Sequence, residues 1–126
     1  ALEVSKRAVK VGFEWPDLPS LWDKVHEELD ELHREVDAHK PEAVKDELGD
    51  LLFTLVNVAR WLKIDPEDAL RTMVSRFTKR FKHMEAEVRR QGHSLSELTI
   101  DQMEELWQAA KVEETKRRPL RDGPTG

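Results

Sequence analysis

Two pairs of acidic residues, each with a spacing of three positions, are the part of this sequence best suited to chemistry. They are Glu28 with Glu31 and Glu47 with Asp50. In an α-helix, residues three apart lie on neighbouring lines of one face, about a turn apart. Two such helices packed antiparallel would direct four carboxylates toward one point. Carboxylates that close repel one another and take up protons unless hard cations lie between them, so the spacing predicts a site for Mg²⁺ or Mn²⁺.

A chance origin of these pairs has to be weighed, because 26 of the 126 residues are Asp or Glu. A single acid pair on a helix usually faces solvent. Here both pairs border apolar stripes on adjacent predicted helices, and Gly49 lies beside Asp50. A glycine in a helix interior costs about 1 kcal/mol relative to alanine, which a close approach by another backbone or a ligand would offset. Together these features support a metal site about as well as a solvated surface.

The helices that must hold these acids are marked by apolar residues that recur every three or four positions. We predict a first helix over residues 20–39, opened by the capping box Ser20-x-x-Asp23. A second helix should cover residues 41–63, with Pro41 in its first turn. On a helical wheel, the acids of both helices fall beside the apolar stripe and therefore next to the core.

Two further helices follow in the sequence. Asp65 and Pro66 suit the start of a third helix, which Gly92 ends after a basic last turn. Thr99-x-x-Gln102 can cap a fourth, shorter helix. The prediction is therefore an all-α fold with four helices.

The predicted organisation is one domain over residues 1–114 and a flexible, basic, Pro/Gly-rich tail over residues 115–126. Residues 1–10 have no clear period, and residues 12–17 resemble an irregular loop. The first two long helices should pair antiparallel. Because the run Leu51-Leu52-Phe53 gives the second helix more apolar surface than one partner could cover, we expect a helical bundle across a homodimer.

Composition restricts the classes of function. Charged residues make up 37% and aromatic residues 6% of the chain, which suits long amphipathic helices. A net charge of -5 and a pI of about 5.6 argue against a general nucleic-acid partner. The absence of cysteine excludes thiol catalysis and zinc–thiolate sites. No apolar run is long enough to span a membrane, and we expect a cytoplasmic protein without a membrane partner.

A basic row lies on the predicted third helix, where Arg76, Arg80 and His83 follow one another at four and three positions. The row could bind phosphate. It could equally form salt bridges with Glu28, Glu35 or Glu85, and both roles could hold at once. The four tryptophans are expected in the core or an interface first, and Trp61 and Trp107 are the best candidates for stacking on a base.

The residues around both acid pairs resemble a known signature. KVHEELDEL from Lys24, followed by ELGDLLF, which starts at Glu47 fifteen positions after Leu32, is similar to the EExxE…ExxD signature of the MazG nucleoside triphosphate pyrophosphohydrolases. VNVARWL from Val56, RFTKRF from Arg76 and EELWQAAK from Glu104 resemble further segments of that family. At Arg76 the family often has lysine, which carries the same charge but binds phosphate differently.

The resemblance covers residues 12–111 and is strongest to the C-terminal catalytic half of the two-domain bacterial enzymes. The chain is thus either a one-domain relative or one half of a larger enzyme. The resemblance implies a Mg²⁺-dependent reaction in which a nucleoside triphosphate, NTP or dNTP, gives the monophosphate and pyrophosphate. It also implies a four-helix domain that forms a bundle across a homodimer.

The resemblance assigns roles to particular residues. The metal ligands would be Glu28, Glu31, Glu47 and Asp50. Candidates for proton transfer or for orienting those ligands, left unranked, are Glu27, Lys24 and Glu35. The outer phosphates would be bound by Arg76, Arg80 and Lys79. The sugar or base would be contacted by Asn57 and Trp61, with Trp107 and Lys111 as weaker candidates.

Two other classes of protein share some of these features. A di-iron carboxylate bundle also places acids on facing helices, but it normally uses Glu-x-x-His pairs, and no Glu lies three positions before a His here. A non-catalytic helical interaction module would have solvated acids and a basic row engaged in salt bridges. Release of pyrophosphate in the presence of Mg²⁺ would distinguish the enzyme from this module.

Overall fold

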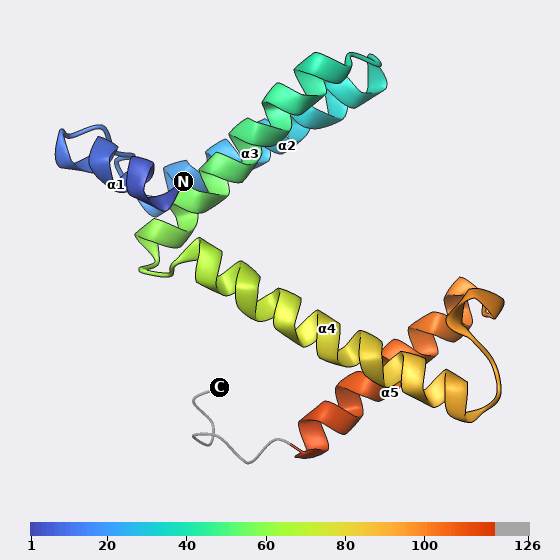
Figure 1. The fold of residues 1–126 in the computed structure, drawn as a ribbon. Coiled ribbons are helices and arrows are strands. Elements are labelled where there is room, and N and C mark those ends of the chain that lie inside the picture. Colours follow the sequence, from blue (N-terminus) through green and yellow to red (C-terminus); the bar gives the residue numbers. More distant parts are fainter. Residues whose placement is uncertain (118–126) are drawn as a thin grey trace. The chain divides into compact units, whose positions relative to one another are not determined.

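The computed structural model describes residues 1–117, with side chains through Lys116. Over that range the chain forms α-helices and one short 3₁₀ helix without any strand, which confirms the all-α prediction (Figure 1). The chain divides into two compact units, residues 1–70 and the residues from Arg71 onward. The elements in chain order are α1 (Leu2–Lys10), α2 (Leu18–Asp37), α3 (Pro41–Trp61), α4 (Pro66–Arg90), η1 (Leu95–Glu97) and α5 (Ile100–Arg117).

α1 is a helix that the sequence did not predict, and it packs against α3. Its buried residues are Leu2, which is 9% exposed, and Ser5, which is 1% exposed. The serine interrupts the apolar period of the buried face, which explains why no helix was expected there. The Ser5 hydroxyl donates a hydrogen bond to Asn57 Oδ1 and accepts one of 2.7 Å from Arg60 Nε. A polar contact with α3 therefore replaces part of the usual apolar packing.

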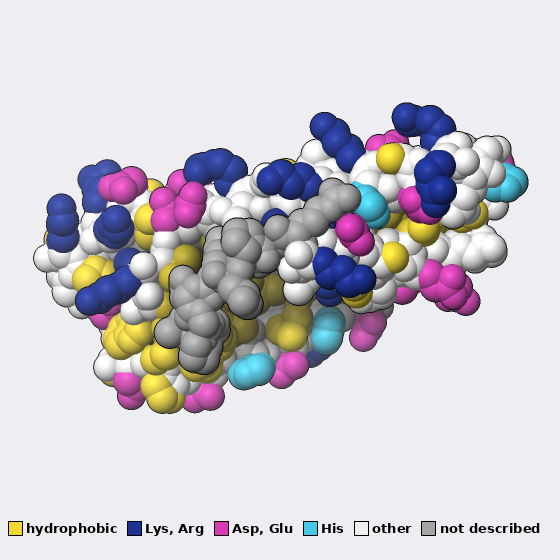
Figure 2. Space-filling view, turned by 90° about the horizontal axis from the view of Figure 1, so that it is seen from below, with side chains coloured by type: hydrophobic (Ala, Val, Ile, Leu, Met, Phe, Trp, Pro, Cys, Tyr) yellow, Lys and Arg dark blue, Asp and Glu magenta, His cyan; other side chains and the backbone are white. Residues whose placement is uncertain are grey.

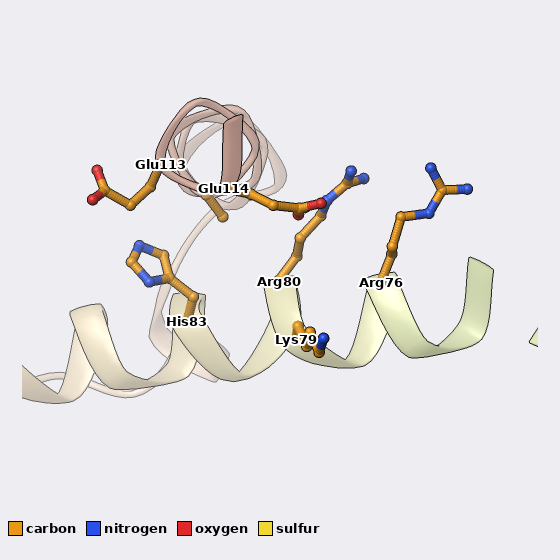
Figure 3. Close-up of a pocket in the computed structure, with 7 residues that line it drawn as sticks. Arg76, Lys79, Arg80, His83, Glu113 and Glu114 are labelled. Carbon is orange, nitrogen blue, oxygen red and sulfur yellow. The ribbon is translucent and has the colours of Figure 1, made fainter. Parts of the chain in front are cut away.

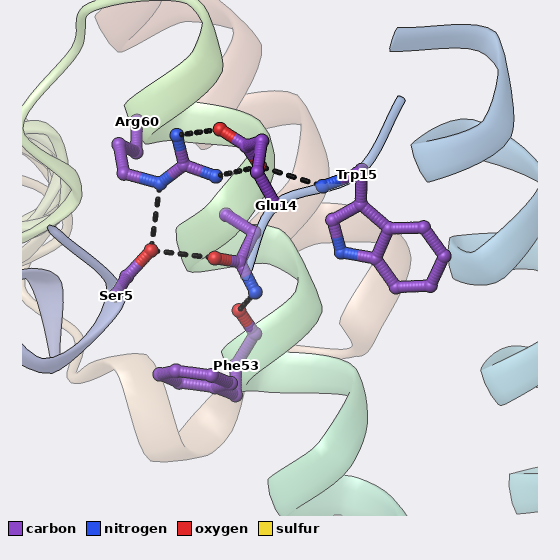
Figure 4. Close-up of polar contacts among 6 residues, drawn as sticks. Ser5, Glu14, Trp15, Phe53 and Arg60 are labelled. Atoms are coloured by element: carbon purple, nitrogen blue, oxygen red, sulfur yellow. Dashed lines mark hydrogen bonds and ion pairs between the residues drawn. The ribbon is translucent and has the colours of Figure 1, made fainter. Parts of the chain in front are cut away.

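The loop after α1 is fixed to α3 by a bidentate ion pair (Figure 4). Two guanidinium nitrogens of Arg60 each donate a hydrogen bond of 2.7 Å to the Glu14 carboxylate. The backbone N–H of Trp15 donates a third bond, 2.9 Å long, to the same carboxylate. These bonds hold the pKa of Glu14 below its ordinary value, and the hydrogen bond from Arg60 has the largest effect. Bidentate, charge-assisted pairs of this kind fix geometry strongly.

α2 begins two residues earlier than predicted, and its cap differs from the predicted one. Asp17 is the N-cap, and its carboxylate accepts a 2.8 Å hydrogen bond from the backbone N–H of Ser20. Pro19, in the first turn, has no N–H that needs a partner. Asp17 thus takes the role that the capping box Ser20-x-x-Asp23 was expected to fill.

α2 and α3 form an antiparallel hairpin, as predicted (Figure 1). The turn between them passes through His39, whose φ of 55° lies in the left-handed region, and Pro41 begins α3. Leu21 of α2 and Val58 of α3 are buried, with 0% and 6% of their surfaces exposed. The hairpin fixes which faces of the two helices oppose each other, and with them the acid pairs.

The second unit contains most of α4 together with η1 and α5. Asp65 caps the start of α4 by accepting a 2.9 Å hydrogen bond from the backbone N–H of Glu67. Gly92, with a φ of 83°, follows the end of α4 as predicted. The predicted capping box of α5 is confirmed, because Thr99 and Gln102 exchange hydrogen bonds of 2.9 and 3.2 Å. α5 continues to Arg117, three residues beyond the expected boundary, and residues 118–126 of the expected tail lie outside the described residues.

Many large apolar side chains are exposed in the single chain, and Figure 2 shows hydrophobic side chains at the surface among charged ones. On α3, Leu48, Leu52, Phe53 and Leu55 are each at least 40% exposed. α3 also carries several charged side chains. None of the helices in the described part of the chain combines the length and the apolar character that a membrane span requires.

Candidate metal and nucleotide site

The α2–α3 hairpin brings three of the four predicted metal ligands together. Glu28 from α2 and Glu47 and Asp50 from α3 each offer a carboxylate oxygen, and these oxygens lie within 4.8 Å of one another. Glu28 is only 4% exposed, whereas Asp50 is exposed. The cluster therefore extends from the helix interface to the surface, where a ligand can reach it.

Glu31, the fourth predicted ligand, lies close enough to Glu47 to change its ionisation. Burial is the main reason why the pKa of Glu47 is raised to about 7, and the neighbouring carboxylates of Glu28 and Glu31 raise it further. Near neutral pH, Glu47 in the metal-free protein is therefore partly protonated. Glu31 is therefore a neighbour of Glu47, although it is not one of the three acids whose oxygens lie within 4.8 Å of one another.

Lys24 partly balances the charge of the cluster. Its Nζ lies 2.8 Å from Glu28 Oε1 and 3.2 Å from Glu27 Oε1. The hydrogen bond between Lys24 and Glu28 is the main cause of a lowered pKa of Glu28 and a raised pKa of Lys24. Glu28 is thus ionised in the folded protein.

Two carboxylate oxygens in the cluster, Glu28 Oε2 and Glu47 Oε2, are buried and have no hydrogen-bond partner among the described residues. An unpaired buried polar atom is costly, and more so when it carries charge. A proton or a cation between the two carboxylates would remove that cost. An all-oxygen set of carboxylates fits a hard divalent cation such as Mg²⁺.

Among the described residues, the structure shows no close neighbour at Gly49, where we expected another backbone or a ligand. A Cβ added there would meet nothing within 4 Å in the described chain. The expectation that another part of this chain approaches closely at Gly49 is therefore wrong. Space beside Asp50 remains for a ligand or for a second molecule.

A cavity of about 590 Å³ adjoins the acidic cluster within the first unit. Glu28 and Asp50 line it, as does Asn57, one of the residues predicted to contact the nucleoside. Trp61, the other, is not among its lining residues. Trp15 does line the cavity, although we expected all four tryptophans in the core or an interface first. The pocket residues from the first unit are Ser5, Ala8, Phe13, Glu14, Trp15, Pro16, Lys24, Glu28, Asp50, Phe53, Thr54 and Asn57.

The predicted basic row lines a separate pocket of about 430 Å³ in the second unit (Figure 3). Arg76, Arg80 and His83 project from α4 on the side where Glu113 and Glu114 of α5 lie. Four of the seven lining residues are basic or histidine, and these are Arg76, Lys79, Arg80 and His83. The row therefore offers several cations to one space.

Arg80 is held by two contacts with α5. Its Nε lies 2.8 Å from Glu114 Oε2, and its guanidinium stacks over the Trp107 ring with Cζ 5.3 Å from the ring centre. Trp107 also contacts Phe77, with ring centres 5.2 Å apart. Trp107 thus positions Arg80, whereas Lys111 of α5 is exposed and does not line the pocket.

Glu114 is the partner of Arg80 that the sequence analysis missed. The acids considered there were Glu28, Glu35 and Glu85. Glu114 follows Trp107 by seven positions, which places both on one face of α5. That spacing could have indicated that Glu114 and Trp107 face the same neighbour. Only the packing of α5 on α4 shows that Glu114 is the acid that pairs with Arg80.

A family model for the MazG nucleotide pyrophosphohydrolase domain matches residues 18–85. The chain belongs to this family. It is 41% identical over 111 residues to a Thermotoga maritima protein named nucleoside triphosphate pyrophosphohydrolase/pyrophosphatase MazG. It is 40% identical over 119 residues to the nucleoside triphosphate pyrophosphohydrolase of Escherichia coli K12. It is also 44% identical over 75 residues to the uncharacterized protein YabN of Bacillus subtilis.

The matched lengths differ between the chain and its relatives. The first two alignments cover 88% and 90% of this chain but only 42% and 44% of the Thermotoga and Escherichia proteins. The YabN alignment covers 60% of this chain and 15% of that protein. The chain therefore spans less than half the length of the curated relatives it matches. The family segment includes the acidic cluster and the basic row, whereas Trp15 and Trp107 lie outside it.

The raised pKa of Glu47 predicts how the stability of the metal-free protein depends on pH. Folding raises the pKa of Glu47 from 4.5 to about 7, so the folded state binds this proton more tightly than the unfolded state does. Glu47 therefore contributes its full stabilisation below pH 4.5, and this contribution is lost as the pH rises through 7. In EDTA, we expect the melting temperature of the parent to fall between about pH 5 and about pH 8 relative to that of Glu47→Gln, which cannot ionise.

The control for this measurement is Asp46→Asn, which removes an exposed carboxylate one position away on α3. Its melting temperature should follow that of the parent across the same range. A constant difference between the parent and Glu47→Gln at every pH would contradict a raised pKa of Glu47.

Proposed function

We propose that this chain is a divalent-metal-dependent nucleoside triphosphate pyrophosphohydrolase, with Mg²⁺ or Mn²⁺ as cofactor. In this reaction, water is added across the anhydride bond between the α- and β-phosphates, so that an NTP or dNTP gives a monophosphate and pyrophosphate. The observation that carries the proposal is the pair of buried, unpartnered oxygens of Glu28 and Glu47 beside Asp50. Family membership and the names of the relatives support it.

Glu28, Glu31, Glu47 and Asp50 would hold the metal. The chemistry that a bound divalent ion supplies is neutralisation of phosphate charge and a lowered pKa of water. Lys24 keeps Glu28 ionised and so ready to act as a ligand. Glu47 would lose its proton when the cation arrives. Glu27, which shares Lys24 with Glu28, and Glu35 are the remaining candidates for accepting a proton.

The basic row would bind the outer phosphates of the substrate. Arg76 and Arg80 suit this role because a guanidinium can donate two parallel hydrogen bonds to phosphate oxygens. Arg80 Nε lies 2.8 Å from Glu114 Oε2, and in this proposal the terminal guanidinium nitrogens donate to the phosphate. Lys79, which lines the same pocket, would add positive charge.

Glu47→Gln and Asp50→Asn should each abolish the Mg²⁺-dependent release of pyrophosphate, because each removes a ligand charge with little change in volume. Relief of repulsion in the cluster should keep or raise the stability of the metal-free protein. The gain in melting temperature that Mg²⁺ gives the parent should also disappear. The assay measures pyrophosphate from a panel of NTPs and dNTPs, with melting temperature measured in parallel.

Asp46→Asn provides the matched control, because it removes an exposed acid from the same turn of α3. It should retain turnover and the response to Mg²⁺. Full activity of Glu47→Gln or Asp50→Asn would refute the metal-site assignment. A parent without pyrophosphate release from any of the nucleotides would favour the non-catalytic interaction module.

Arg80→Gln tests the phosphate role of the basic row. It should weaken triphosphate binding far more than binding of the monophosphate, which lacks the outer phosphates. Loss of one charge-assisted contact costs about 1.5–3 kcal/mol, or roughly ten- to a hundred-fold in affinity. Calorimetric titration with Ca²⁺ in place of Mg²⁺, to slow turnover, measures both affinities.

The exposed Lys82 on the same helix provides the control variant Lys82→Gln, which should leave both affinities unchanged. Arg80 also bonds to Glu114, so a purely structural role would lower the melting temperature. In that case the ratio of triphosphate to monophosphate affinity would stay as in the parent, and the phosphate role would be refuted.

A homodimer is the second part of the proposal. Leu52 and Phe53 of α3 are 55% and 40% exposed in the single chain, and a second α2–α3 hairpin would cover them. Sedimentation at micromolar concentration should show a dimer, and the melting temperature should rise with protein concentration because association stabilises the folded state. A monomer with a concentration-independent melting temperature would refute this part.

A further inference from the structure

Two acids of α5, Glu113 and Glu114, line the pocket of the basic row in the second unit (Figure 3). Glu114 contacts the row directly, because its Oε2 lies 2.8 Å from Arg80 Nε. A carboxylate repels a phosphate that is bound nearby. An acid inside a pocket that is proposed to bind phosphate is therefore expected to have a role that outweighs this repulsion.

The contact between Glu114 and Arg80 uses one particular edge of the guanidinium. A guanidinium has one N–H at Nε and four at its two terminal nitrogens. The bond with Glu114 uses the Nε–H. It does not use the terminal N–H groups, which can donate two parallel hydrogen bonds to the oxygens of one phosphate. The Arg80 side chain is 14% exposed and that of Glu114 is 29% exposed, so solvent screens the pair only partly.

The residues of α5 that hold Arg80 share one face of that helix. Trp107, Ala110 and Glu114 follow one another at three and four positions. Trp107 lies over the face of the guanidinium, with Cζ 5.3 Å from the ring centre, and Glu114 binds its Nε edge. Ala110, between them, is 3% exposed and lines the pocket. α5 thus contacts Arg80 at both its face and its edge.

Arg80 and Arg76 differ in how firmly they are held. Arg76 is exposed, and one of its terminal nitrogens lies 3.6 Å from the sulfur of Met73, a weak acceptor on the same helix. Arg80 is instead held by two contacts from another helix. A long side chain loses rotamer freedom when it binds a ligand, and prior fixation avoids part of this entropy cost. Arg80 is therefore the better prepared of the two arginines.

The basic row also has an electrostatic cost in the ligand-free protein. Arg76, Lys79 and Arg80 lie within about one turn of α4. Like charges at this spacing destabilise a helix. Glu114 offsets one of these charges through its contact with Arg80. The same contact thus stabilises the row before a ligand arrives and sets the orientation of one of its members.

From these observations we propose that Glu114 is a positioning residue, which fixes the Arg80 guanidinium so that its terminal nitrogens face the outer phosphates of the substrate. This inference rests on the proposed phosphate role of the basic row. Glu114 does not contact the phosphate in this arrangement and acts through Arg80. The gain in affinity from an arginine that is already placed exceeds the loss from repulsion between the carboxylate and the phosphate.

Two variants separate the geometry of Glu114 from its charge. Glu114→Asp keeps the charge, but its side chain is one methylene shorter and withdraws the carboxylate from Arg80 Nε. Glu114→Gln removes the charge but keeps an oxygen that can accept the Nε–H. Both are measured by calorimetric titration of the full chain with Ca²⁺ in place of Mg²⁺. The ligands are the triphosphate and the monophosphate of the nucleotide that the parent hydrolyses fastest.

The positioning role predicts opposite ranks for these variants from those that charge alone predicts. Glu114→Asp should lower the ratio of triphosphate to monophosphate affinity by about two- to ten-fold, because Arg80 is no longer fixed before binding. Glu114→Gln should stay close to the parent. If Glu114 acted by charge alone, Glu114→Asp would keep the parent ratio and Glu114→Gln would raise triphosphate affinity.

Two controls accompany the measurement. Glu105→Gln removes an exposed acid from the same helix and should leave both affinities unchanged. In an Arg80→Gln background, Glu114→Asp should change the affinity ratio no further, because Glu114 acts through Arg80. A general structural defect would instead add its effect in both backgrounds.

The outcomes distinguish this inference from the proposed function. If Arg80→Gln weakens triphosphate binding but Glu114→Asp keeps the parent ratio, the positioning role is overturned and the phosphate role of the row stands. Equal losses in Glu114→Asp and Glu114→Gln would also overturn it, because glutamine keeps the acceptor. If Arg80→Gln itself keeps the parent ratio, both roles fail, while pyrophosphate release by the parent still tests the metal site separately.

Discussion

The approach of the Glu28 and Glu47 carboxylates across the α2–α3 interface is the constraint on which the site depends. Antiparallel packing of the hairpin places acids from two helices within 4.8 Å, and two of their buried oxygens have no hydrogen-bond partner in the described part of the chain. Lys24 pairs with Glu28, and burial together with the neighbouring carboxylates raises the pKa of Glu47 to about 7, so Glu47 is partly protonated near neutral pH in the absence of metal. The hairpin thus stores repulsion that a hard cation would relieve.

The contacts of α1 and the following loop extend this hairpin into a concave site. Ser5 and Glu14 both bind Arg60, so one arginine of α3 fixes the helix before the loop and the loop itself. Because that loop carries Trp15, the Glu14–Arg60 ion pair fixes the backbone of an aromatic residue that lines the same cavity as Glu28 and Asp50. In the second unit, Arg80 has a comparable arrangement, since Trp107 and Glu114 of α5 hold it in place.

Sequence patterns predicted most of the helices because their signals are local. The apolar periods of α2 to α5 and the capping box at Thr99 and Gln102 depend on residues within a turn or two of one another. The acids of the cluster were predicted for the same reason, since i, i+3 spacing within a helix fixes a shared face. The first helix escaped prediction because its buried face contains Ser5, which is stabilised by residues more than fifty positions away.

By itself, the sequence determined the fold class, the acid pairs and the basic row, because helical periodicity makes each of them a property of a single segment. Only the tertiary structure decided the partners. It paired Arg80 with Glu114, tied Glu14 to Arg60 and placed Trp15, not Trp61, at the cavity beside the acids. The physical reason is that side chains on different helices meet according to helix packing and register, which no local spacing encodes.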